Sequence, residues 1–419
     1  MFDSSFIRLK GLARPIKRKV RRVSSGFLLG CALMVFGASA SAAWNLWDEY
    51  KAVHFDNGRI VDYRDSGPVT TSESQSYGLF FALVAGDKEA FDRILDWTVR
   101  NLADGDMKRN LPAWLWGGRQ KEAASEKEGE NPATKTGEVS SSEPEKVRVP
   151  PLQPQEVVVG IIDANNATDA DLWTVYSLLE ASRIWKEPKY KELASAMLSQ
   201  LESLIVDIPN IGKVLLPGRQ GFVKEEGYLL NPSYYPPFIL QRIAAEYPQW
   251  EEVRDGLLKV LVKNAPDGFA SDWAYFDREG NWLPKGNSTG SWDAIRVYLW
   301  VGMLSKDNGQ RELLKNQFKN MVLITEKMNF PPEEIDTDKL VVVKPQRKGF
   351  GAALLPLLDN PKTKGLIRTS LEHRTMKPSN YYQNSLKLFG LGFDNAVFKF
   401  SPEGYLVLSP EDPRMRGIF

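Results

Sequence analysis

Three acidic residues stand at equivalent places in three strongly apolar segments of the sequence. Glu73 lies near the start of SESQSYGLFFALVA, Asp169 in ATDADLWTVYSLL, and Asp293 in SWDAIRVYLWVGM. Each falls in the predicted first turn of a helix, where a carboxylate interacts favourably with the helix dipole, so a purely structural role is open for each. Carboxyl groups can also act as general acids and bases. Which role applies depends on whether the three helix N-termini converge.

The helices that carry these acids are apolar on nearly every side, whereas the helices that follow them are amphipathic. Ser72 is the predicted N-cap of the first, with Gln75 completing a capping box. The next helix has one apolar stripe, made of Phe91, Ile94, Leu95 and Trp97. This alternation predicts an all-α toroid of helical hairpins with an inner and an outer ring. All inner helices of such a ring point the same way, so Glu73, Asp169 and Asp293 should meet on one face.

The same pattern continues along the chain with short β-hairpins between the helices. Further helical segments are predicted at 190–205, 231–264, 311–329, 350–358 and 379–391, and hairpins at 213–230, 269–283 and 397–408.

The first 42 residues have the order of a secretory signal peptide. Eight Lys and Arg precede the apolar run 26–38, and the small residues Ala40 and Ala42 follow it. Thirteen apolar residues are short for a bilayer span, so cleavage after Ala42 is favoured over a retained anchor, and no membrane span is expected afterwards. Cys31 is the only cysteine and leaves with the signal. A periplasmic or secreted protein without disulfides is therefore expected.

The remainder, 43–419, is predicted to be one domain interrupted by a disordered insertion at about 119–154. That stretch is rich in Glu, Lys, Ser and Pro and contains few apolar residues, so it cannot bury a core. The chain carries net charge +1, of which the basic N-terminus accounts for +7, leaving about −6 for the body. A mildly acidic body argues against nucleic acid as a partner.

Several chemistries have no support in the sequence. His54 and His373 are the only histidines and neither lies in a motif, which disfavours a Ser-His-Asp triad and a histidine-based metal site. An Asp-rich calcium site around 163–171 has only weak support. Phosphate-binding and dinucleotide-binding loops are missing from the sequence. We therefore expect neither a metal nor a cofactor.

Six motifs in one order closely resemble glycoside hydrolase family 8. They are TSESQSYG, LPAWLWG, ATDADLWTVYSLLEASRIW, LLPGRQGF, NPSYYPP and SWDAIRVYLWVGM. Within that family they are most similar to the periplasmic endo-β-1,4-glucanases that accompany bacterial cellulose synthase. The resemblance covers the chain from Trp44 onward except the insertion. It implies an (α/α)6 barrel and hydrolysis of a β-1,4-glucan with inversion.

The resemblance also implies roles for individual residues. Glu73 matches the general acid and Asp293 the general base, and Asp169 matches the acid of the ATDAD signature. Tyr234 and Arg296 match residues near the cleaved bond. Inversion needs one carboxyl to protonate the leaving oxygen and another to activate water, separated by roughly 6.5–9.5 Å. A helix N-terminus lowers a carboxyl pKa, so burial or a neighbouring carboxylate has to raise that of Glu73.

Trp114, Trp116 and Trp273 are candidate substrate-binding residues. An indole face can stack on the C–H surface of a sugar, and a packing role in the core is equally open. Two family positions differ here, with Ser74 in place of a Gly after the acid and Trp292 in place of a Tyr before the base.

Two functions are compatible with the sequence. One is an exported endo-β-1,4-glucanase linked to bacterial cellulose synthesis, whose partners would be a β-1,4-glucan chain and the cellulose synthase export complex. The other is a non-catalytic glucan-binding protein that assists cellulose export. The three acids at the family's motifs favour the enzyme, because a binding protein has no need of all three.

Overall fold

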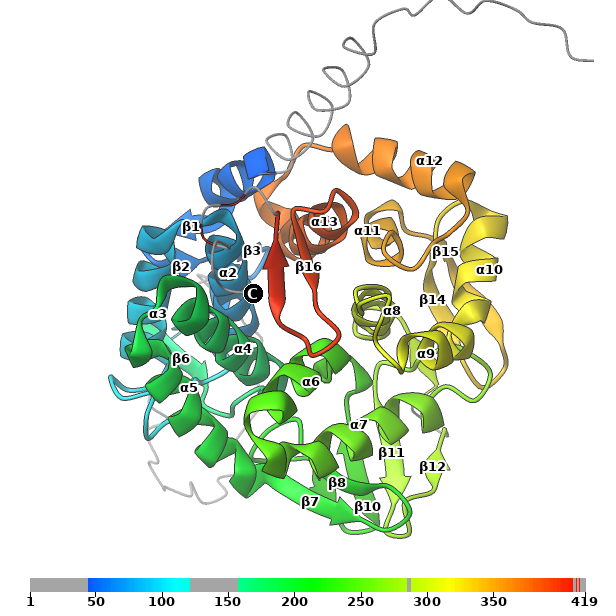
Figure 1. Cartoon of the computed structure of the whole chain (residues 1–419), viewed down its shortest axis with the longest axis horizontal. Helices are drawn as coiled ribbons and strands as arrows, with labels where there is room; N and C mark the ends of the chain where they lie inside the picture. Colours follow the sequence, from blue (N-terminus) through cyan, green and yellow to red (C-terminus); the bar gives the residue numbers. More distant parts are fainter. Residues whose placement is uncertain (1–43, 121–156, 285–287, 410–411, 413, 415–419) are drawn as a thin grey trace, which may run out of the picture.

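The computed structural model describes residues 44–120, 157–284, 288–409, 412 and 414. In this part of the chain, six helices form an inner ring: α2 (Ser72–Ala85), α4 (Thr168–Trp185), α6 (Pro237–Glu246), α8 (Ala294–Gly302), α11 (Gly351–Leu354) and α13 (Tyr381–Asp394). Outside them lie a helix over residues 44–54, α3 (Lys88–Leu102), α5 (Pro188–Leu201), α7 (Glu251–Lys263), α9 (Arg311–Gln317) with α10 (Lys319–Met328), and α12 (Pro361–Glu372). Figure 1 looks down the two rings. The predicted (α/α)6 barrel is confirmed.

Burial separates the two rings as the sequence pattern predicts. In α2 every residue except Glu73 and Ala85 is buried, so the helix packs on all sides. In α3 only one stripe is buried, made of Ala90, Phe91, Ile94, Thr98 and Leu102. Spacings of three and four residues place that stripe on the face turned toward the inner ring.

The start of α2 differs by one residue from the sequence prediction. Thr71, not Ser72, is the N-cap, and Ser74, not Gln75, completes the capping box. The preceding strand runs through Thr71, which fixes the backbone there in an extended conformation. The Gln75 side chain is used elsewhere: its Oε1 accepts from Ile60 N (2.6 Å) and its Nε2 donates to Gly58 O (3.0 Å).

Aromatic side chains fill the middle of the barrel. Phe80, Trp173, Trp300 and Phe389 come from four inner helices and contact one another in a closed circuit, with ring centroids 4.9–5.6 Å apart. Tyr77 packs edge-on against Trp173 (5.8 Å) and Phe389 (5.0 Å). The middle of the barrel is thus a packed core, and these aromatic side chains hold the inner helices, and hence their N-termini, in place.

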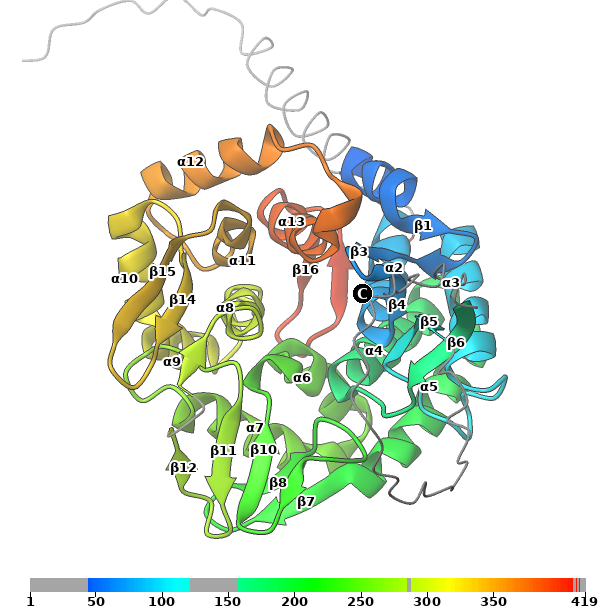
Figure 2. The same cartoon turned by 180° about the vertical axis from the view of Figure 1, so that it is seen from behind.

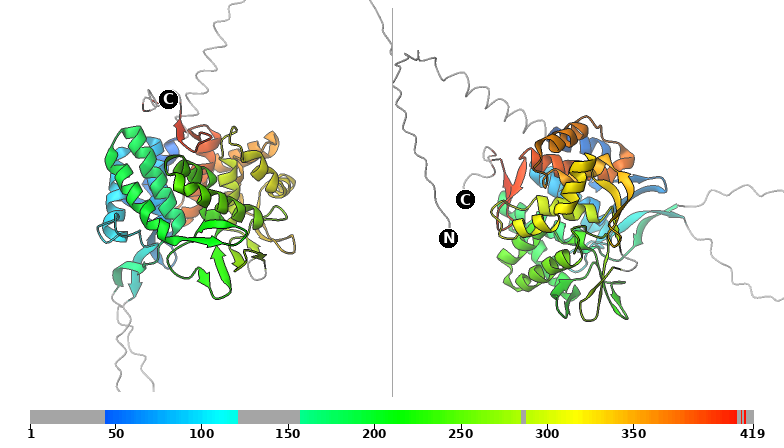
Figure 3. Two further views of the ribbon diagram at one scale, coloured as in Figure 1. Left: turned by 60° about the horizontal axis from the view of Figure 1, so that its bottom comes forward. Right: turned by 90° about the vertical axis from the view of Figure 1, so that its right-hand side faces the viewer.

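A hairpin covers the other end of the barrel, where the inner helices finish. Strands β16 (Phe398–Phe400) and β17 (Leu406–Leu408) lie across the ring in Figure 1 and at one end of the molecule in the side view of Figure 3. Phe400 stacks on Phe238 of α6 at 4.0 Å, and the hydroxyl of Tyr176 donates to Gly404 O. The predicted terminal hairpin at 397–408 is confirmed.

Strands lead into the helices that carry the acids. The sheet β3 (Asp62–Arg64), β4 (Gly67–Thr71), β5 (Leu115–Gln120), β6 (Val157–Asp163) is antiparallel and comes forward in Figure 2. Thr71 pairs with Leu115, and Leu115 pairs with Asp163. Because β4 precedes α2 and β6 precedes α4, this register sets the N-termini of α2 and α4 side by side.

Other strands form small sheets around the ring. These are β1 (Phe55–Asp56) with β2 (Arg59–Ile60), β7 (Ile205–Ile208) with β8 (Gly212–Leu215), the sheet of β9 (Val223–Lys224), β10 (Gly227–Leu230), β11 (Ala274–Asp277) and β12 (Trp282–Leu283), and the sheet of β13 (Thr289–Gly290), β14 (Pro332–Asp336) and β15 (Val341–Gln346). The hairpin predicted at 269–283 is β11–β12. The hairpin predicted at 213–230 is present in the second half of that range as β9–β10, whereas the first half, β8, pairs back with β7.

Some sequence predictions fall outside the described residues. The signal peptide at 1–42 does so entirely, and so does the proposed insertion at 119–154 except residues 119 and 120, which belong to β5. Helix α12 and the β14–β15 hairpin were not predicted. Within the described residues, no helix combines the length and apolarity needed to cross a membrane.

Candidate active site

The three predicted acids converge at the N-terminal end of the inner ring. Glu73 is the second residue of α2, Asp169 the second residue of α4, and Asp293 the residue immediately before α8. Glu73 and Asp293 do not cap their own helices through their side chains, because Thr71 caps α2 and Asp293 makes no side-chain capping bond to α8. Asp169 does bond to the first turn of α4, where its Oδ1 accepts from the Ala170 N–H.

One guanidinium joins all three carboxylates. Arg296 Nη1 donates to Glu73 Oε2 (2.5 Å) and to Asp169 Oδ2 (3.1 Å), and its Nη2 donates to Asp293 Oδ1 (2.6 Å). The Arg296 side chain is only 3% exposed. Three carboxylates around one buried cation leave an excess of negative charge when all are ionised, so the cluster favours taking up a proton.

Glu73 is the member whose surroundings suit it to hold that proton. Burial, opposed by the charge of Arg296 and assisted by the nearby Asp169 and Asp293, raises its pKa to about 7. The hydroxyl of Tyr381 donates to Glu73 Oε1 (3.2 Å). The Glu73 side chain is 22% exposed, so it is not closed off from a ligand. Burial and like charge therefore outweigh the lowering effect that a helix N-terminus exerts on an acid.

Asp169 is held more rigidly than Glu73. Its Oδ1 accepts from the Ala170 N–H (2.8 Å), its Oδ2 accepts from Arg296, and only 5% of its side chain is exposed. Burial raises its pKa, while Arg296 and the Ala170 N–H oppose that rise. Because both of its carboxylate oxygens accept hydrogen bonds, Asp169 is suited to provide a fixed negative charge beside the reacting atoms.

Asp272 is a functional neighbour that the sequence analysis missed. Its Oδ1 accepts from the N–H groups of Ser291 (2.8 Å), Asp293 (3.0 Å) and Ala294 (2.8 Å), so it caps α8 from a distant segment. Burial raises its pKa to about 6, an effect that the Ala294 N–H opposes and the Asp293 charge strengthens. Asp272 thereby fixes the backbone that carries Asp293. In the sequence, Asp272 is marked only by its place directly before Trp273, and that gives no indication that it bonds to the start of α8.

Asp171, the second acid of ATDAD, has a different environment. It is fully buried, and its Oδ2 accepts from Asn166 Nδ2 (2.7 Å). Asn166 Oδ1 in turn accepts from Arg219 N (2.9 Å), which joins the start of α4 to the LLPGRQGF loop. Burial raises the pKa of Asp171 to about 8, against the Asn166 hydrogen bond, so it is a neutral acid at neutral pH.

Tyrosines complete the wall of the site. Tyr77 OH accepts from Arg296 Nη1 (3.1 Å), and the Tyr234 ring lies 5.8 Å from the Arg296 guanidinium carbon. Burial raises the phenol pKa of Tyr77, Tyr234 and Tyr381 well above the usual range. All three therefore remain neutral hydroxyls that can donate hydrogen bonds.

The structure places the three candidate tryptophans in different surroundings. Trp273 lies 6.2 Å from Tyr234 and stacks on Phe222 at 5.9 Å, which connects it to the carboxylate cluster. The Trp114 backbone bonds to Ser72 N and to Asn165 O, between the N-termini of α2 and α4. Trp116, which is in β5, instead packs against Trp97 of α3 and under the Arg59 guanidinium.

The two positions that differ from the family pattern have local explanations. Ser74 Oγ closes the capping box by accepting from Thr71 N (3.2 Å) and donates to Ile60 O (3.0 Å), which a glycine could not do. Trp292 is 39% exposed, with the Arg347 guanidinium 4.2 Å from its ring. Its indole is therefore available at the surface next to Asp293.

Comparison with known proteins agrees with this geometry. The chain is 37% identical over 390 residues to a protein from Escherichia coli (strain K12) named "Endoglucanase", covering 91% of this chain and 96% of that one. It is 34% identical over 403 residues to an "Endoglucanase" of Xanthomonas axonopodis pv. citri (strain 306), covering 92% and 96%. Among solved structures, the endo-1,4-D-glucanase from Vibrio fischeri ES114 is 34% identical with a TM-score of 0.74, covering 87% of this chain and 99% of that one.

A family model covers most of the chain as well. The model described as glycosyl hydrolases family 8 matches residues 22–140 and 152–396. These ranges contain Glu73, Asp169, Asp293 and Arg296. The chain is therefore a glycoside hydrolase and belongs to glycosyl hydrolase family 8.

Proposed function

We propose that this protein is an endo-β-1,4-glucanase, a cellulase that hydrolyses internal bonds of a cellulose-like β-glucan with inversion at the anomeric carbon. The observation that carries the proposal is the pairing of a carboxyl with a pKa of about 7, Glu73, with a second carboxylate, Asp293, on one guanidinium. An inverting glycosidase needs such a pair, one group protonated and one ionised.

The proposed reaction assigns one step to each of the two carboxyl groups. Glu73 gives its proton to the glycosidic oxygen as the bond from that oxygen to the anomeric carbon breaks. Asp293 takes a proton from a water molecule, and the water oxygen attacks the anomeric carbon from the opposite face. One water is consumed, Glu73 is left ionised and Asp293 protonated, and exchange with solvent restores both.

Asp169 and Arg296 act on the charge that develops in this step. The transition state is oxocarbenium-like and carries positive charge on the sugar ring. Asp169 holds a fixed negative charge beside Glu73, and preorganised charge of this kind needs no rearrangement during the reaction. Arg296 keeps the three carboxyl groups at fixed positions through its hydrogen bonds.

Viscometry on carboxymethylcellulose tests the proposed endo-acting cellulase. Internal cleavage should lower the viscosity well before many reducing ends appear, and Glu73→Gln should abolish both changes. A rise in reducing ends without early loss of viscosity would point to an exo-acting enzyme. If the enzyme released reducing ends from xylan but none from carboxymethylcellulose, its substrate would be a different glycan.

We further propose that Trp273 stacks on a sugar of the bound chain, because it adjoins Tyr234 at the edge of the cluster. Trp273→Ala, made in the Glu73→Gln protein so that ligand survives, should bind cellopentaose about 2- to 10-fold more weakly, the range expected for one aromatic contact. Calorimetric titration measures this. Trp116→Ala serves as the comparison, since its contacts to Trp97 and Arg59 favour a packing role. If both variants lost cellopentaose affinity equally and kept the melting temperature of the parent protein, the assignment of stacking to Trp273 and packing to Trp116 would be refuted.

We also infer export and a connection with bacterial cellulose synthesis. The support is the signal-like order of residues 1–42 and the motif resemblance to the glucanases that accompany cellulose synthase. The substrate would be the β-1,4-glucan chain during export, with the synthase export complex as a partner. Cell fractionation with N-terminal sequencing should find a mature chain that begins at Ala43 outside the cytoplasm. An intact N-terminus in the cytosolic fraction would refute the inference.

A further inference from the structure

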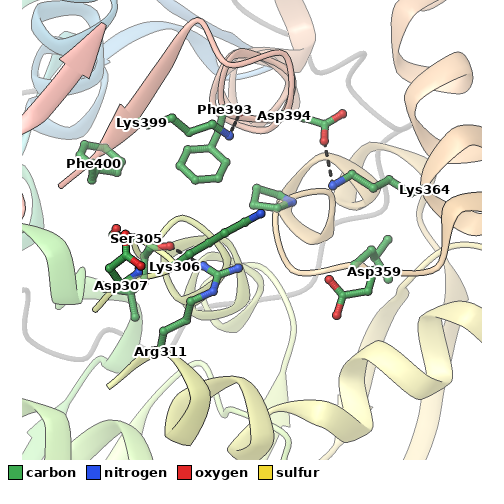
Figure 4. Close-up of a pocket in the computed structure, with 13 residues that line it drawn as sticks. Ser305, Lys306, Asp307, Arg311, Asp359, Lys364, Phe393, Asp394, Lys399 and Phe400 are labelled. Carbon is green, nitrogen blue, oxygen red and sulfur yellow. Dashed lines mark hydrogen bonds and ion pairs between the residues drawn. The ribbon is translucent and has the colours of Figure 1, made fainter. Parts of the chain in front are cut away.

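A second cavity lies at the end of the barrel opposite the carboxylate cluster. Its volume is about 480 Å³. Asp293 stands at the start of α8 and Leu304 just beyond its end, so the helix separates the two sites by roughly 14 Å of axial rise. Figure 4 shows four basic side chains that project toward this space from different elements. The lining residues that matter are Lys306, Arg311, Lys364, Lys399, Asp359 and Asp394.

Three of these cations, Lys306, Lys399 and Arg311, have no ion pair with a carboxylate among the described residues, whereas Lys364 pairs with Asp394. The Lys399 ammonium contacts the carbonyl of Phe393 and lies 3.5 Å from the Phe393 ring centroid. An ammonium has three N–H donors, so this carbonyl leaves donors available to a ligand. Arg311 Nη1 donates to the carbonyls of Gly302 and Leu304, at the end of α8, and the other nitrogens of its guanidinium bond to no other group in the part of the chain that the structure describes.

The buried acid of the cavity is already neutralised by other bases. Asp394 forms ion pairs with Lys364 (2.9 Å) and Arg368 (2.6 Å), and only 3% of its side chain is exposed. Asp359 pairs with Lys315 at 2.5 Å. Asp307 is exposed at the rim, as is Lys306. Lys399 and Arg311 therefore have carboxylates nearby, Asp394 for the first and Glu312 and Asp359 for the second, but neither cation forms an ion pair among the described residues.

The electrostatics of Lys399 agree with that geometry. Burial lowers its pKa to about 8. Asp394 opposes this, while Lys364, Lys306 and Arg311 lower the pKa further by repulsion. A bound anion would relieve the repulsion among these four cations and would hold the Lys399 proton more tightly.

We propose that this cavity is a binding site for a small oxyanion, held between Lys399, Arg311 and Lys306. A sulfate, phosphate or carboxylate group offers several acceptor oxygens, as these three unpaired cations require. The cavity is larger than a bare ion, and Leu304, Leu358 and Phe400 line its apolar side. A small organic acid or a phosphate ester therefore suits the space better than an inorganic ion alone.

Calorimetric titration with sodium sulfate tests the site, in sodium chloride of matched ionic strength to remove general screening. Wild type should bind one sulfate, and Lys399→Gln should weaken binding about tenfold or more, the amount expected for one charge-assisted hydrogen bond. Lys362→Gln, an exposed lysine of α12 outside the cavity, should bind like wild type. Lys306→Gln provides a second variant at the exposed rim, should Lys399→Gln fold poorly.

The pH dependence gives an independent readout. The charged groups that face Lys399 are Lys306 and Asp307 after α8, Arg311 of α9, Asp359 and Lys364 around α12, and Asp394 of α13. Sulfate keeps its charge throughout the range, so its affinity should be flat below pH 8 and fall above it as Lys399 loses its proton, until the total loss matches that of Lys399→Gln. Lys399→Gln should remove that fall.

Organic probes distinguish the possible sources of the oxyanion. Glucose 6-phosphate and gluconate are each titrated against bound sulfate, with neutral glucose as the control. Competition by one of them assigns a phosphate ester or a carboxylate. The proposal is overturned if wild type does not bind sulfate, or if all lysine variants bind it alike. Lys399→Gln should retain full glucanase activity, so this result is separate from the test of the catalytic carboxyls.

Discussion

Replacing Glu73 by Gln should lower the rate of glucan hydrolysis by about 10²–10⁴, the usual contribution of a general acid. The amide fills the same space and can still bond to Arg296, but it has no proton to give to the leaving oxygen. An aryl cellobioside with a good leaving group needs less protonation, so its rate should fall much less. Steady-state kinetics on cello-oligosaccharides and on the aryl glycoside measure the two effects.

A matched control and a pH profile sharpen this prediction. Glu89→Gln changes an acid in the first turn of the neighbouring outer helix, where 84% of the side chain is exposed, and should leave activity unchanged. Because the pKa of Glu73 is about 7, the wild-type kcat/KM should fall about tenfold per pH unit above neutrality, as the acid loses its proton. Equal losses on both substrates in Glu73→Gln would mean that Glu73 is not the proton donor.

Replacing Asp293 by Asn should abolish hydrolysis of every substrate, whatever its leaving group. An amide cannot take the proton from water, so the nucleophile stays weak even when the leaving group departs easily. The expected loss is again about 10²–10⁴ or more, with the binding of cellopentaose retained. Rates on the aryl glycoside and on cello-oligosaccharides should fall together, in contrast to Glu73→Gln.

Asp267→Asn provides the control for this substitution, because Asp267 is exposed in the loop after α7. A melting temperature for Asp293→Asn close to that of wild type excludes unfolding as the cause. If Asp293→Asn kept its rate on the aryl glycoside, water activation would have to come from another group, and Asp169 would be the next to test.

The elements that sequence predicts well are those with strong local signals. Apolar residues on all sides of α2 identify an inner helix, and the single stripe around Phe91 and Ile94 identifies an outer one. Parallel inner helices then imply that Glu73, Asp169 and Asp293 meet. The predicted N-cap, Ser72, lies one residue after the observed N-cap, Thr71. Both side chains can cap a helix, and only the length of β4 decides between them.

Residues whose roles depend on distant partners were not predictable in this way. Asp272 caps α8 from 19 residues before Ser291, and Tyr381 reaches Glu73 from 308 residues away. Helix α12 was missed although Asn360 and Pro361 form a good start, because its buried stripe has only three residues, Thr363, Ile367 and Leu371. The packing of Trp116 on Trp97 likewise depends on which face of β5 its indole takes, which sequence leaves open.

The anomeric configuration of the first product tests the assignment of Glu73 as acid and Asp293 as base most directly. Proton NMR during the first minutes of cellopentaose hydrolysis, before mutarotation, reads the new reducing end. Attack by a water that Asp293 activates predicts the α anomer, because the substrate bond is β and the configuration inverts. A β product would mean a double displacement through a covalent intermediate, and Asp293 could then not be the base.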